Sequence, residues 1–193
     1  MKQFFLTFLT VIILLPIHSY SKTETAIFAG GCFWCVESDF DKILGVISTE
    51  SGYDGGTSND PSYKTVSAGK TNYAESVKIT FDSDKVSYAY LVNYFWHHID
   101  PTVSNAQFCD HGKQYRSAIF YENESQKIIA LKSLDIVKKE LKTIYTQITT
   151  STKFYPAEEY HQGYYKKNPL RYKYYRWNCG RDKRVDDIWG DIN

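Results

Sequence analysis

The sequence predicts an α+β fold: a βαββαβ ferredoxin-like plait with an added helix, an edge strand and an irregular C-terminal tail. Three observations support this prediction. Segments with strand and helix periodicity follow one another in the order β-α-β-β-α-β, which buries one sheet face under two helices. The 193 residues are 42% hydrophobic, enough for one substantial core. No repeat or long linker interrupts the chain after Lys22, so residues 22–193 form one domain.

The first half of the plait starts with an apolar strand from Thr25 to Ala29, which leads into Gly30-Gly31. We expect a helix next, because apolar residues recur at helical spacing at Phe33, Val36, Phe40, Ile43 and Leu44. Gly45 should end this helix. Val46 to Tyr53 predicts the second strand. The turn-forming residues from Asp54 to Pro61 then predict a long loop.

The second half repeats the order of strand, helix and strand. Apolar and polar residues alternate from Glu75 to Asp82, as in a half-buried strand. Ser83 is a suitable N-cap for a helix that ends before Pro101. Arg116 to Tyr121 completes the plait as its fourth strand.

Further elements follow the plait. A long amphipathic helix is expected from Ser125 to Tyr145, and Thr146 to Thr150 adds an edge strand. Beyond Pro156 the pattern supports only a short helix from Glu158 to Lys167. We expect the remainder to be a packed but irregular tail.

Residues 1–21 have the layout of a secretory signal peptide. Lys2 precedes an apolar stretch from Phe4 to Leu15, and the small-residue pattern Ser19-Tyr20-Ser21 suggests cleavage after Ser21. The apolar stretch falls short of the roughly 20 residues that cross a bilayer, which favours cleavage over a retained anchor. We therefore expect a protein without a stable membrane anchor, exported to the periplasm or secreted, where disulfides persist.

Charge and cysteine content narrow the possible functions. The formal net charge of +1 falls to zero when Lys2 is removed with the leader, so no global charge favours nucleic acid. A neutral polypeptide or small-molecule substrate fits better, and we expect a monomer. The four cysteines include the pair Cys32-x-x-Cys35, which is compatible with a redox dithiol, half of a zinc site, or a nucleophile with an incidental neighbour.

Cys32 is the first candidate for chemistry, because it lies between the end of a strand and the start of a helix. Free backbone N–H groups and the helix dipole favour a thiolate at such a position. The alternative is a buried, inert cysteine. The preceding Gly30-Gly31 argues against it, because two glycines let a substrate approach the backbone closely.

The segments around Cys32 resemble a known family. Gly31-Cys32-Phe33-Trp34-Cys35-Val36-Glu37 is similar to the signature of the A-type peptide methionine sulfoxide reductases, and the likeness covers nearly all of Thr25 to Arg184. It continues through Gly52-Tyr53, Pro61-Ser62-Tyr63, Tyr73-Ala74-Glu75-Ser76-Val77, Asp110-His111-Gly112-Lys113-Gln114-Tyr115-Arg116-Ser117 and Phe154-Tyr155-Pro156-Ala157-Glu158-Glu159-Tyr160-His161-Gln162.

This resemblance implies a role for each matched residue. Cys32 would attack the sulfoxide sulfur, Glu75 would protonate the sulfoxide oxygen, and the hydroxyls of Tyr63 and Tyr115 would surround that oxygen. Other positions would bind the substrate: Phe33 and Trp34 as an aromatic pocket for the S-methyl group, Asp110 at the substrate main chain, and His161 at the mouth of the site. A solvated Glu75, a loop-capping Asp110 and a surface His161 are the duller alternatives.

Attack would leave Cys32 as a sulfenic acid, which condenses with a second thiol to form a disulfide. We expect Cys179 to be this resolving thiol, because the neighbouring glycine and the tail would allow it to move; Cys109 and Cys35 are rivals. The resemblance implies the S epimer of methionine sulfoxide, free or protein-bound, as substrate. It implies no bound cofactor or metal, and a thioredoxin-like external reductant.

Three other functions compete with this one. A thioredoxin-like dithiol oxidoreductase would explain Cys32 and Cys35 but not the segments around Glu75 and Asp110. A structural zinc site would need four cysteines, of which the second pair is widely spaced. The basic, aromatic stretch from Lys166 to Arg184 could contact nucleic acid or an acidic reductase partner, but such a stretch more often wraps its own domain.

Overall fold

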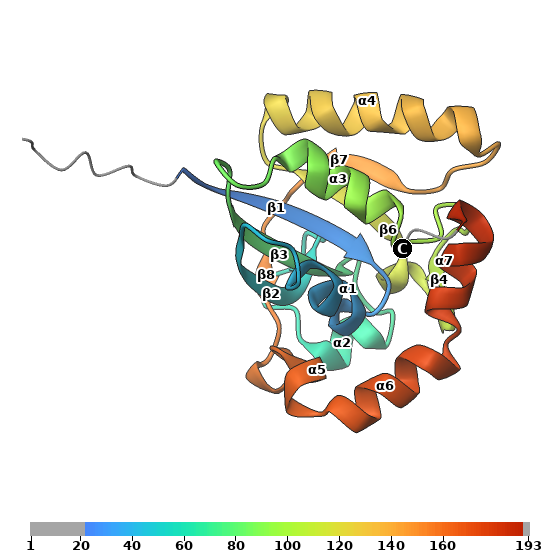
Figure 1. Cartoon of the computed structure of the whole chain (residues 1–193). Helices are drawn as coiled ribbons and strands as arrows, with labels where there is room; N and C mark the ends of the chain where they lie inside the picture. Colours follow the sequence, from blue (N-terminus) through green and yellow to red (C-terminus); the bar gives the residue numbers. More distant parts are fainter. Residues whose placement is uncertain (1–21, 191–193) are drawn as a thin grey trace, which may run out of the picture.

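The computed structural model describes residues 22–190, so the predicted signal peptide at residues 1–21 lies outside the described residues. A six-stranded sheet with the order β7-β6-β1-β3-β2-β8 forms the centre of the domain (Figure 1). Its strands are β1 (Thr23–Gly30), β2 (Val46–Asp54), β3 (Ala74–Asp82), β6 (Ser117–Tyr121), β7 (Gln147–Thr150) and β8 (Tyr155–Pro156). The α+β prediction is confirmed, because β6-β1-β3-β2 is the antiparallel order of a ferredoxin-like plait.

Helices α1 (Phe33–Phe40) and α3 (Tyr88–Trp96) cover one face of the sheet. There Phe28 stacks with Phe40 and Phe95, at centroid distances of 5.2 and 4.9 Å. The predicted long helix is α4 (Glu124–Glu140), which ends earlier than expected and packs on α3 (Figure 1). The predicted edge strand is present as β7, which runs parallel to β6.

The register between β2 and β3 pairs Tyr53 with Glu75. Side chains alternate across a strand, so Glu75 shares the helix-covered face with Val77 and Ile79 of the main core. Ala74 belongs to the smaller cluster on the other face. The pairing register therefore directs the Glu75 carboxyl group toward the start of α1.

The prediction of an irregular tail is wrong. The chain forms a 3-10 turn at Glu159–His161, then α5 (Tyr164–Lys167), α6 (Pro169–Asn178) and α7 (Arg181–Trp189). Proline at the first position of α6 and Gly180 at φ +63° between α6 and α7 favour this arrangement. The helical pattern of α6 and α7 is hard to recognise in the sequence, because most of their residues are charged or exposed. Only Tyr172 of α6 and Val185 of α7 are buried apolar residues of these two helices.

Shorter elements complete the fold. Helix α2 (Tyr63–Ser67) follows the loop that was predicted from Asp54 to Pro61. A small hairpin pairs β4 (Ala106–Gln107) with β5 (Asp110–His111), and a 3-10 turn follows at Lys113–Tyr115. Among the described residues, no helix has the length and apolar content that crossing a membrane requires.

Candidate active site

Cys32 is the N-cap of α1, immediately after the end of β1, as the sequence predicted. The turn between them needs a glycine at position 31. Gly31 has φ +83°, and a Cβ there would lie 2.6 Å from the Cβ of Gln107. The turn holds Cys32 close to β3 and the β4–β5 hairpin, and only 7% of the residue is exposed.

Glu75 lies beside Cys32 and is 2% exposed. Its Oε2 atom accepts a hydrogen bond of 3.2 Å from the Phe33 backbone N–H at the start of α1. Burial nevertheless raises the pKa of Glu75 to about 8, and the nearby Asp110 carboxylate acts in the same direction. The alternative of a solvated edge carboxylate is wrong, because this carboxyl group is buried and largely protonated at neutral pH.

The expected thiolate at Cys32 is not what the geometry favours. Burial raises the pKa of Cys32 well above its ordinary value, and Cys35, Glu75 and Asp110 add to the shift. The Phe33 N–H, one of the groups at the helix start that would stabilise a thiolate, already donates to Glu75. Cys32 is therefore a thiol in the protein without substrate.

Trp34 is held by aromatic residues from the tail. Its ring stacks on Tyr164 at 3.7 Å between centroids and meets the edge of Tyr175 at 5.8 Å. Phe33 is 1% exposed and lies 6.4 Å from Trp34 and 4.9 Å from the His161 ring. The predicted pair thus forms a fixed apolar wall next to Cys32.

His161 is 2% exposed, so the surface alternative is wrong. The Trp34 indole N–H donates to its Nδ1 atom at 3.0 Å. An indole nitrogen only donates, so Nδ1 must be the acceptor and the ring proton is on Nε2. Burial lowers the pKa of His161, which keeps the ring neutral. The buried Nε2 atom has no hydrogen-bond partner, leaving a donor free for a ligand.

Tyr63 and Tyr115 are half-buried and come from α2 and from the 3-10 turn at Lys113–Tyr115. The Tyr63 ring lies 4.2 Å from His161, and its backbone N–H donates to Glu158 at 2.9 Å. Burial raises the pKa of Tyr63 to about 12 and also raises that of Tyr115, and the Glu75 carboxyl group contributes next in both cases. Both phenols therefore remain protonated donors close to Glu75.

Asp110 connects Cys32 to the tail. The hydroxyl of Tyr175 on α6 donates to Asp110 Oδ2 at 2.5 Å. Burial raises the pKa of Asp110, although the bond from Tyr175 opposes this shift. Tyr175 lies in the tail that was expected to be irregular, and Tyr164 lies in the short helix predicted from Glu158 to Lys167; no local pattern indicated that either residue reaches the site.

The four cysteines form two pairs. Cys109 and Cys179 are joined by a disulfide with a Cα–Cα distance of 4.8 Å, while Cys32 and Cys35 are free and buried. Cys35 packs against Tyr164 and Tyr172, as expected for a residue facing the core. Its pKa is lowered by a hydrogen bond with Cys32 and by Arg181 and Arg176. The four-cysteine zinc hypothesis does not fit, because two of the four sulfurs are bonded to each other.

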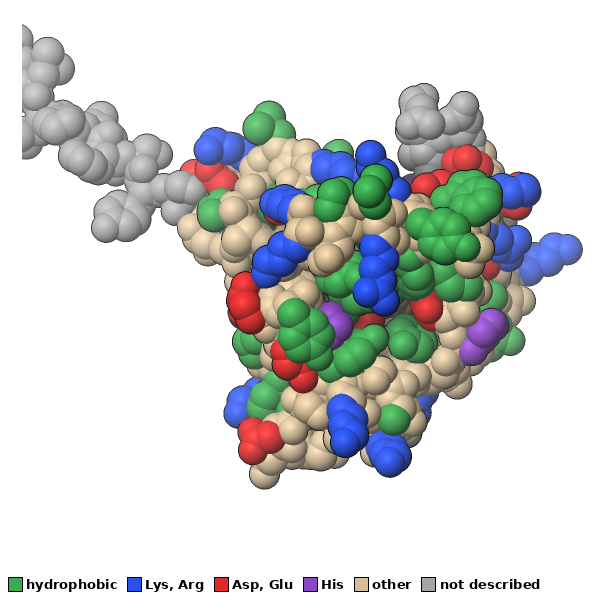
Figure 2. Space-filling view, turned by 90° about the horizontal axis from the view of Figure 1, so that it is seen from below, with side chains coloured by type: hydrophobic (Ala, Val, Ile, Leu, Met, Phe, Trp, Pro, Cys, Tyr) green, Lys and Arg blue, Asp and Glu red, His purple; other side chains and the backbone are tan. Residues whose placement is uncertain are grey.

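The face that carries α5 and α6 is shown in Figure 2, where apolar, acidic and histidine side chains surround a central hollow with cationic side chains near it.

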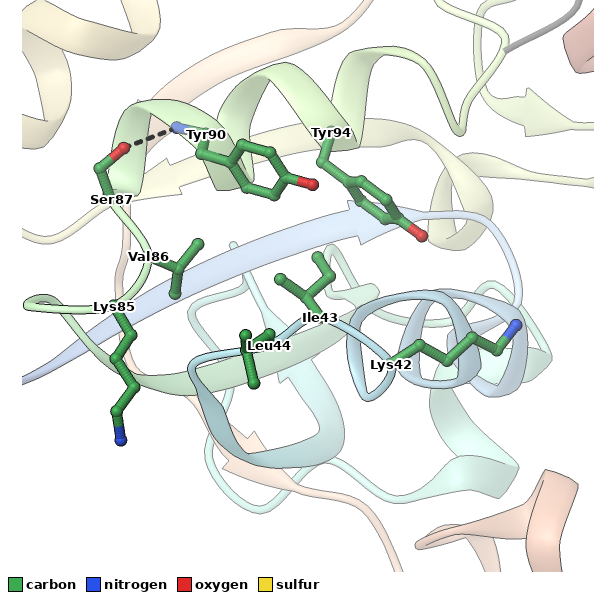
Figure 3. Close-up of a pocket in the computed structure, with 8 residues that line it drawn as sticks. All are labelled: Lys42, Ile43, Leu44, Lys85, Val86, Ser87, Tyr90 and Tyr94. Carbon is green, nitrogen blue, oxygen red and sulfur yellow. Dashed lines mark hydrogen bonds between the residues drawn. The ribbon is translucent and has the colours of Figure 1, made fainter. Parts of the chain in front are cut away.

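A second groove of about 530 Å³ lies between the turn after α1 and the start of α3 (Figure 3). No thiol, carboxyl or imidazole group lines that groove; its lining is Lys42, Ile43, Leu44, Lys85, Val86, Ser87, Tyr90 and Tyr94. Thiol chemistry therefore belongs to the region around Cys32.

The arrangement suits one kind of reaction. A buried thiol, a protonated carboxylic acid and two phenols converge beside an aromatic wall. Together they can attack an electrophilic atom whose oxygen must gain a proton.

Known proteins are similar to this chain in sequence. The profile of the family described as peptide methionine sulfoxide reductase matches residues 24–193. MsrA 2 of Caulobacter vibrioides is 45% identical over 91% of this chain and 90% of its own length. MsrA/MsrB of Vibrio cholerae is 48% identical over 86% of this chain, which spans only 45% of that longer protein.

Solved structures have a similar fold. Reduced Mxr1 of Saccharomyces cerevisiae has a TM-score of 0.73 and 33% identity, covering 77% of this chain and 87% of that one. Mxr1 in complex with Trx2 aligns with a TM-score of 0.53 at 19% identity, over 79% and 91%.

Proposed function

The chain belongs to the peptide methionine sulfoxide reductase family and is a methionine sulfoxide reductase, and we propose that Cys32 is its nucleophile. The observation that carries this proposal is a protonated Glu75 bonded to the Phe33 N–H, directly after Cys32 at the start of α1, where its charge would act on the Cys32 thiol. A sulfoxide sulfur is a poor electrophile until its oxygen gains a proton. A neutral carboxylic acid beside the thiol supplies that proton at physiological pH.

The first step transfers one oxygen atom. Glu75 donates its proton to the sulfoxide oxygen as Cys32 attacks the sulfur, and Glu75 then recovers a proton from the thiol. The products are methionine and Cys32 sulfenic acid, so the sulfoxide is reduced and Cys32 is oxidised. The hydroxyls of Tyr63 and Tyr115 donate to the same oxygen as negative charge develops on it.

Substrate binding rests on the aromatic wall and two polar groups. The S-methyl group has no hydrogen-bonding atom, so Phe33 and Trp34 recognise it by contact. The Nε2–H of His161 donates to an oxygen of the substrate, which gives this buried donor the partner it lacks. Asp110 accepts from a substrate main-chain N–H once Tyr175 moves away.

Resolution of the sulfenic acid takes two steps, a condensation and a thiol–disulfide exchange. The Cys179 thiol condenses with the Cys32 sulfenic acid, which releases water and forms a Cys32–Cys179 disulfide. Cys109 then attacks the Cys179 sulfur, which frees the Cys32 thiol and leaves the Cys109–Cys179 disulfide. The Cys109–Cys179 disulfide in the structure fits the product of the second step. Cys109 is exposed, so a protein reductant can reach this disulfide.

We propose a thioredoxin-like protein as that reductant, with no bound cofactor. The support is the complex that yeast Mxr1 forms with Trx2. Two further proposals rest on sequence alone: a monomer, and export with removal of residues 1–21 to the periplasm or outside the cell. The mass of the protein recovered from expressing cells tests the cleavage, and a full-length mass in every fraction would contradict it.

The experiment that tests the relay is peptide mass spectrometry after one turnover with the separated S epimer. Wild type should yield the Cys109–Cys179 bridge, Cys109→Ser the Cys32–Cys179 bridge, and Cys32→Ser no methionine. A Cys32–Cys35 bridge in Cys109→Ser would assign resolution to Cys35 instead. Activity on the R epimer alone would overturn the assigned chemistry.

A further inference from the structure

Arg181 is a buried cation that takes no part in the proposed reaction steps. It begins α7, two residues after Cys179, and is 2% exposed. Burying a guanidinium removes it from water at a cost that an apolar side chain of similar volume would avoid. Its position therefore calls for contacts that an apolar residue does not make.

Those contacts reach the segments of the other redox cysteines. Arg181 Nη1 donates to the Gly30 carbonyl at 3.0 Å, two residues before Cys32. Its Cζ atom lies 4.6 Å from the centre of the Phe108 ring, one residue before Cys109. One guanidinium thus contacts both of these segments while its own backbone follows Cys179.

Phe108 supplies a second, independent observation. Its φ angle is +54°, a left-handed conformation that costs a non-glycine residue roughly 1–2 kcal/mol. Such a conformation persists only where surrounding contacts hold it. The cation–π contact with Arg181 is one of them, and the resulting turn presents Cys109 to Cys179.

The remaining contacts fix the guanidinium itself. Nη2 donates to the His98 carbonyl at 2.8 Å, and Asp39 Oδ2 lies 3.6 Å away. Asp39 also pairs with Arg176 at 2.8 Å, so Asp39 keeps a cation if Arg181 is replaced. The main task of Arg181 is therefore geometric rather than neutralisation of Asp39.

We propose that Arg181 is a positioning residue for the transfer of oxidation from Cys32 to the Cys109–Cys179 pair, because it holds the three cysteine-bearing segments together. The inference rests on the proposed relay. It concerns the two disulfide steps and leaves the oxygen transfer to Cys32 to the groups described above.

Rapid-quench experiments on the whole chain separate the steps. A stoichiometric methionine sulfoxide peptide is mixed with reduced Arg181→Met or Arg181→Lys, and methionine release is timed against formation of the Cys109–Cys179 bridge. Methionine release should stay within about twofold of wild type. Bridge formation should slow by about tenfold to a hundredfold in Arg181→Met, with Cys32 sulfenic acid trapped by dimedone, and by less in Arg181→Lys.

Arg184→Met is the matched control. Arg184 also lies on α7 and also pairs with a buried carboxylate, Asp100 at 2.7 Å, but its side chain bonds to Asp100 and Thr102 and to none of the cysteine-bearing segments. Equal slowing of both steps in Arg181→Met, or the same effect in Arg184→Met, would overturn the proposal. So would wild-type bridge formation in Arg181→Met.

A second variant keeps the test decisive if Arg181→Met does not fold. Phe108→Leu preserves an apolar side chain and removes the ring beneath the guanidinium, so it should also delay the bridge without delaying methionine release. An unchanged bridge rate in Phe108→Leu would then reject the proposal. Failure of the relay itself would look different, because wild type would form no Cys109–Cys179 bridge at all.

Discussion

Replacing Glu75 with glutamine should change stability in a pH-dependent way. The pKa of Glu75 rises from 4.5 to about 8 on folding, because the carboxyl group is buried. The native protein keeps the proton while the unfolded chain loses it above pH 4.5. Wild type therefore loses stability between pH 4.5 and 8 relative to a variant with a neutral amide.

The pKa shift gives the size of the effect. Each pKa unit corresponds to 1.36 kcal/mol, so the full shift is worth about 5 kcal/mol and the part accumulated by pH 7 about 3 kcal/mol. Glu75→Gln keeps an oxygen that accepts from the Phe33 N–H. The difference in unfolding free energy between variant and wild type should therefore be near zero at pH 4.5 and should favour the variant increasingly up to pH 8.

Urea unfolding at several pH values, with both proteins fully reduced, measures this difference. Activity supplies the second readout: the single-turnover rate of wild type should fall as pH rises through about 8, and Glu75→Gln should be slower by roughly 10²–10⁴ and lack that decline. Two parallel stability curves between pH 5 and 8 would refute the claim that Glu75 is buried and protonated. An unchanged rate in Glu75→Gln would refute its role as the acid.

Three further predictions concern the neighbours of Cys32. Tyr63→Phe and Tyr115→Phe should each lower single-turnover rates by roughly tenfold to a hundredfold, because each removes a donor to the sulfoxide oxygen; full rates in both would exclude that contact. His161→Asn should raise KM for a peptide substrate about tenfold, since it removes the Nε2–H donor, and steady-state kinetics with unchanged KM would count against this bond. Cys109→Ser should still release one methionine per molecule in a burst assay but lose most turnover supported by a thioredoxin-like protein; full turnover would mean that another thiol passes on the oxidation.

The plait and the place of Cys32 at a helix start could be predicted from the sequence, because both depend on local patterns. Alternation revealed β3, and the two glycines marked the turn before Cys32. The tail could not be predicted in the same way. The partners of its buried residues lie far away in the chain: Tyr175 bonds to Asp110, and Arg181 to Gly30.

The ionisation state of Cys32 shows why position in a helix was insufficient. A helix start favours a thiolate only while its N–H groups are free, and here Glu75 already accepts from the Phe33 N–H, while Asp110 beside the helix start also raises the pKa of Cys32. Neither carboxyl group is near Cys32 in sequence. Their effect at the helix start exists only once β3 and the β4–β5 hairpin are in place.

The pairing of β2 with β3 also ties chemistry to correct folding. A slip of one residue in the pairing of β2 with β3 would move the Glu75 side chain to the opposite face of the sheet. The side chains of Val77 and Ile79 would leave the core with it. A misregistered molecule would thus lose its acid and its apolar packing in the same event. Misfolded copies are then both inactive and unstable, so they are open to removal by proteases and do not persist as folded but defective repair enzymes.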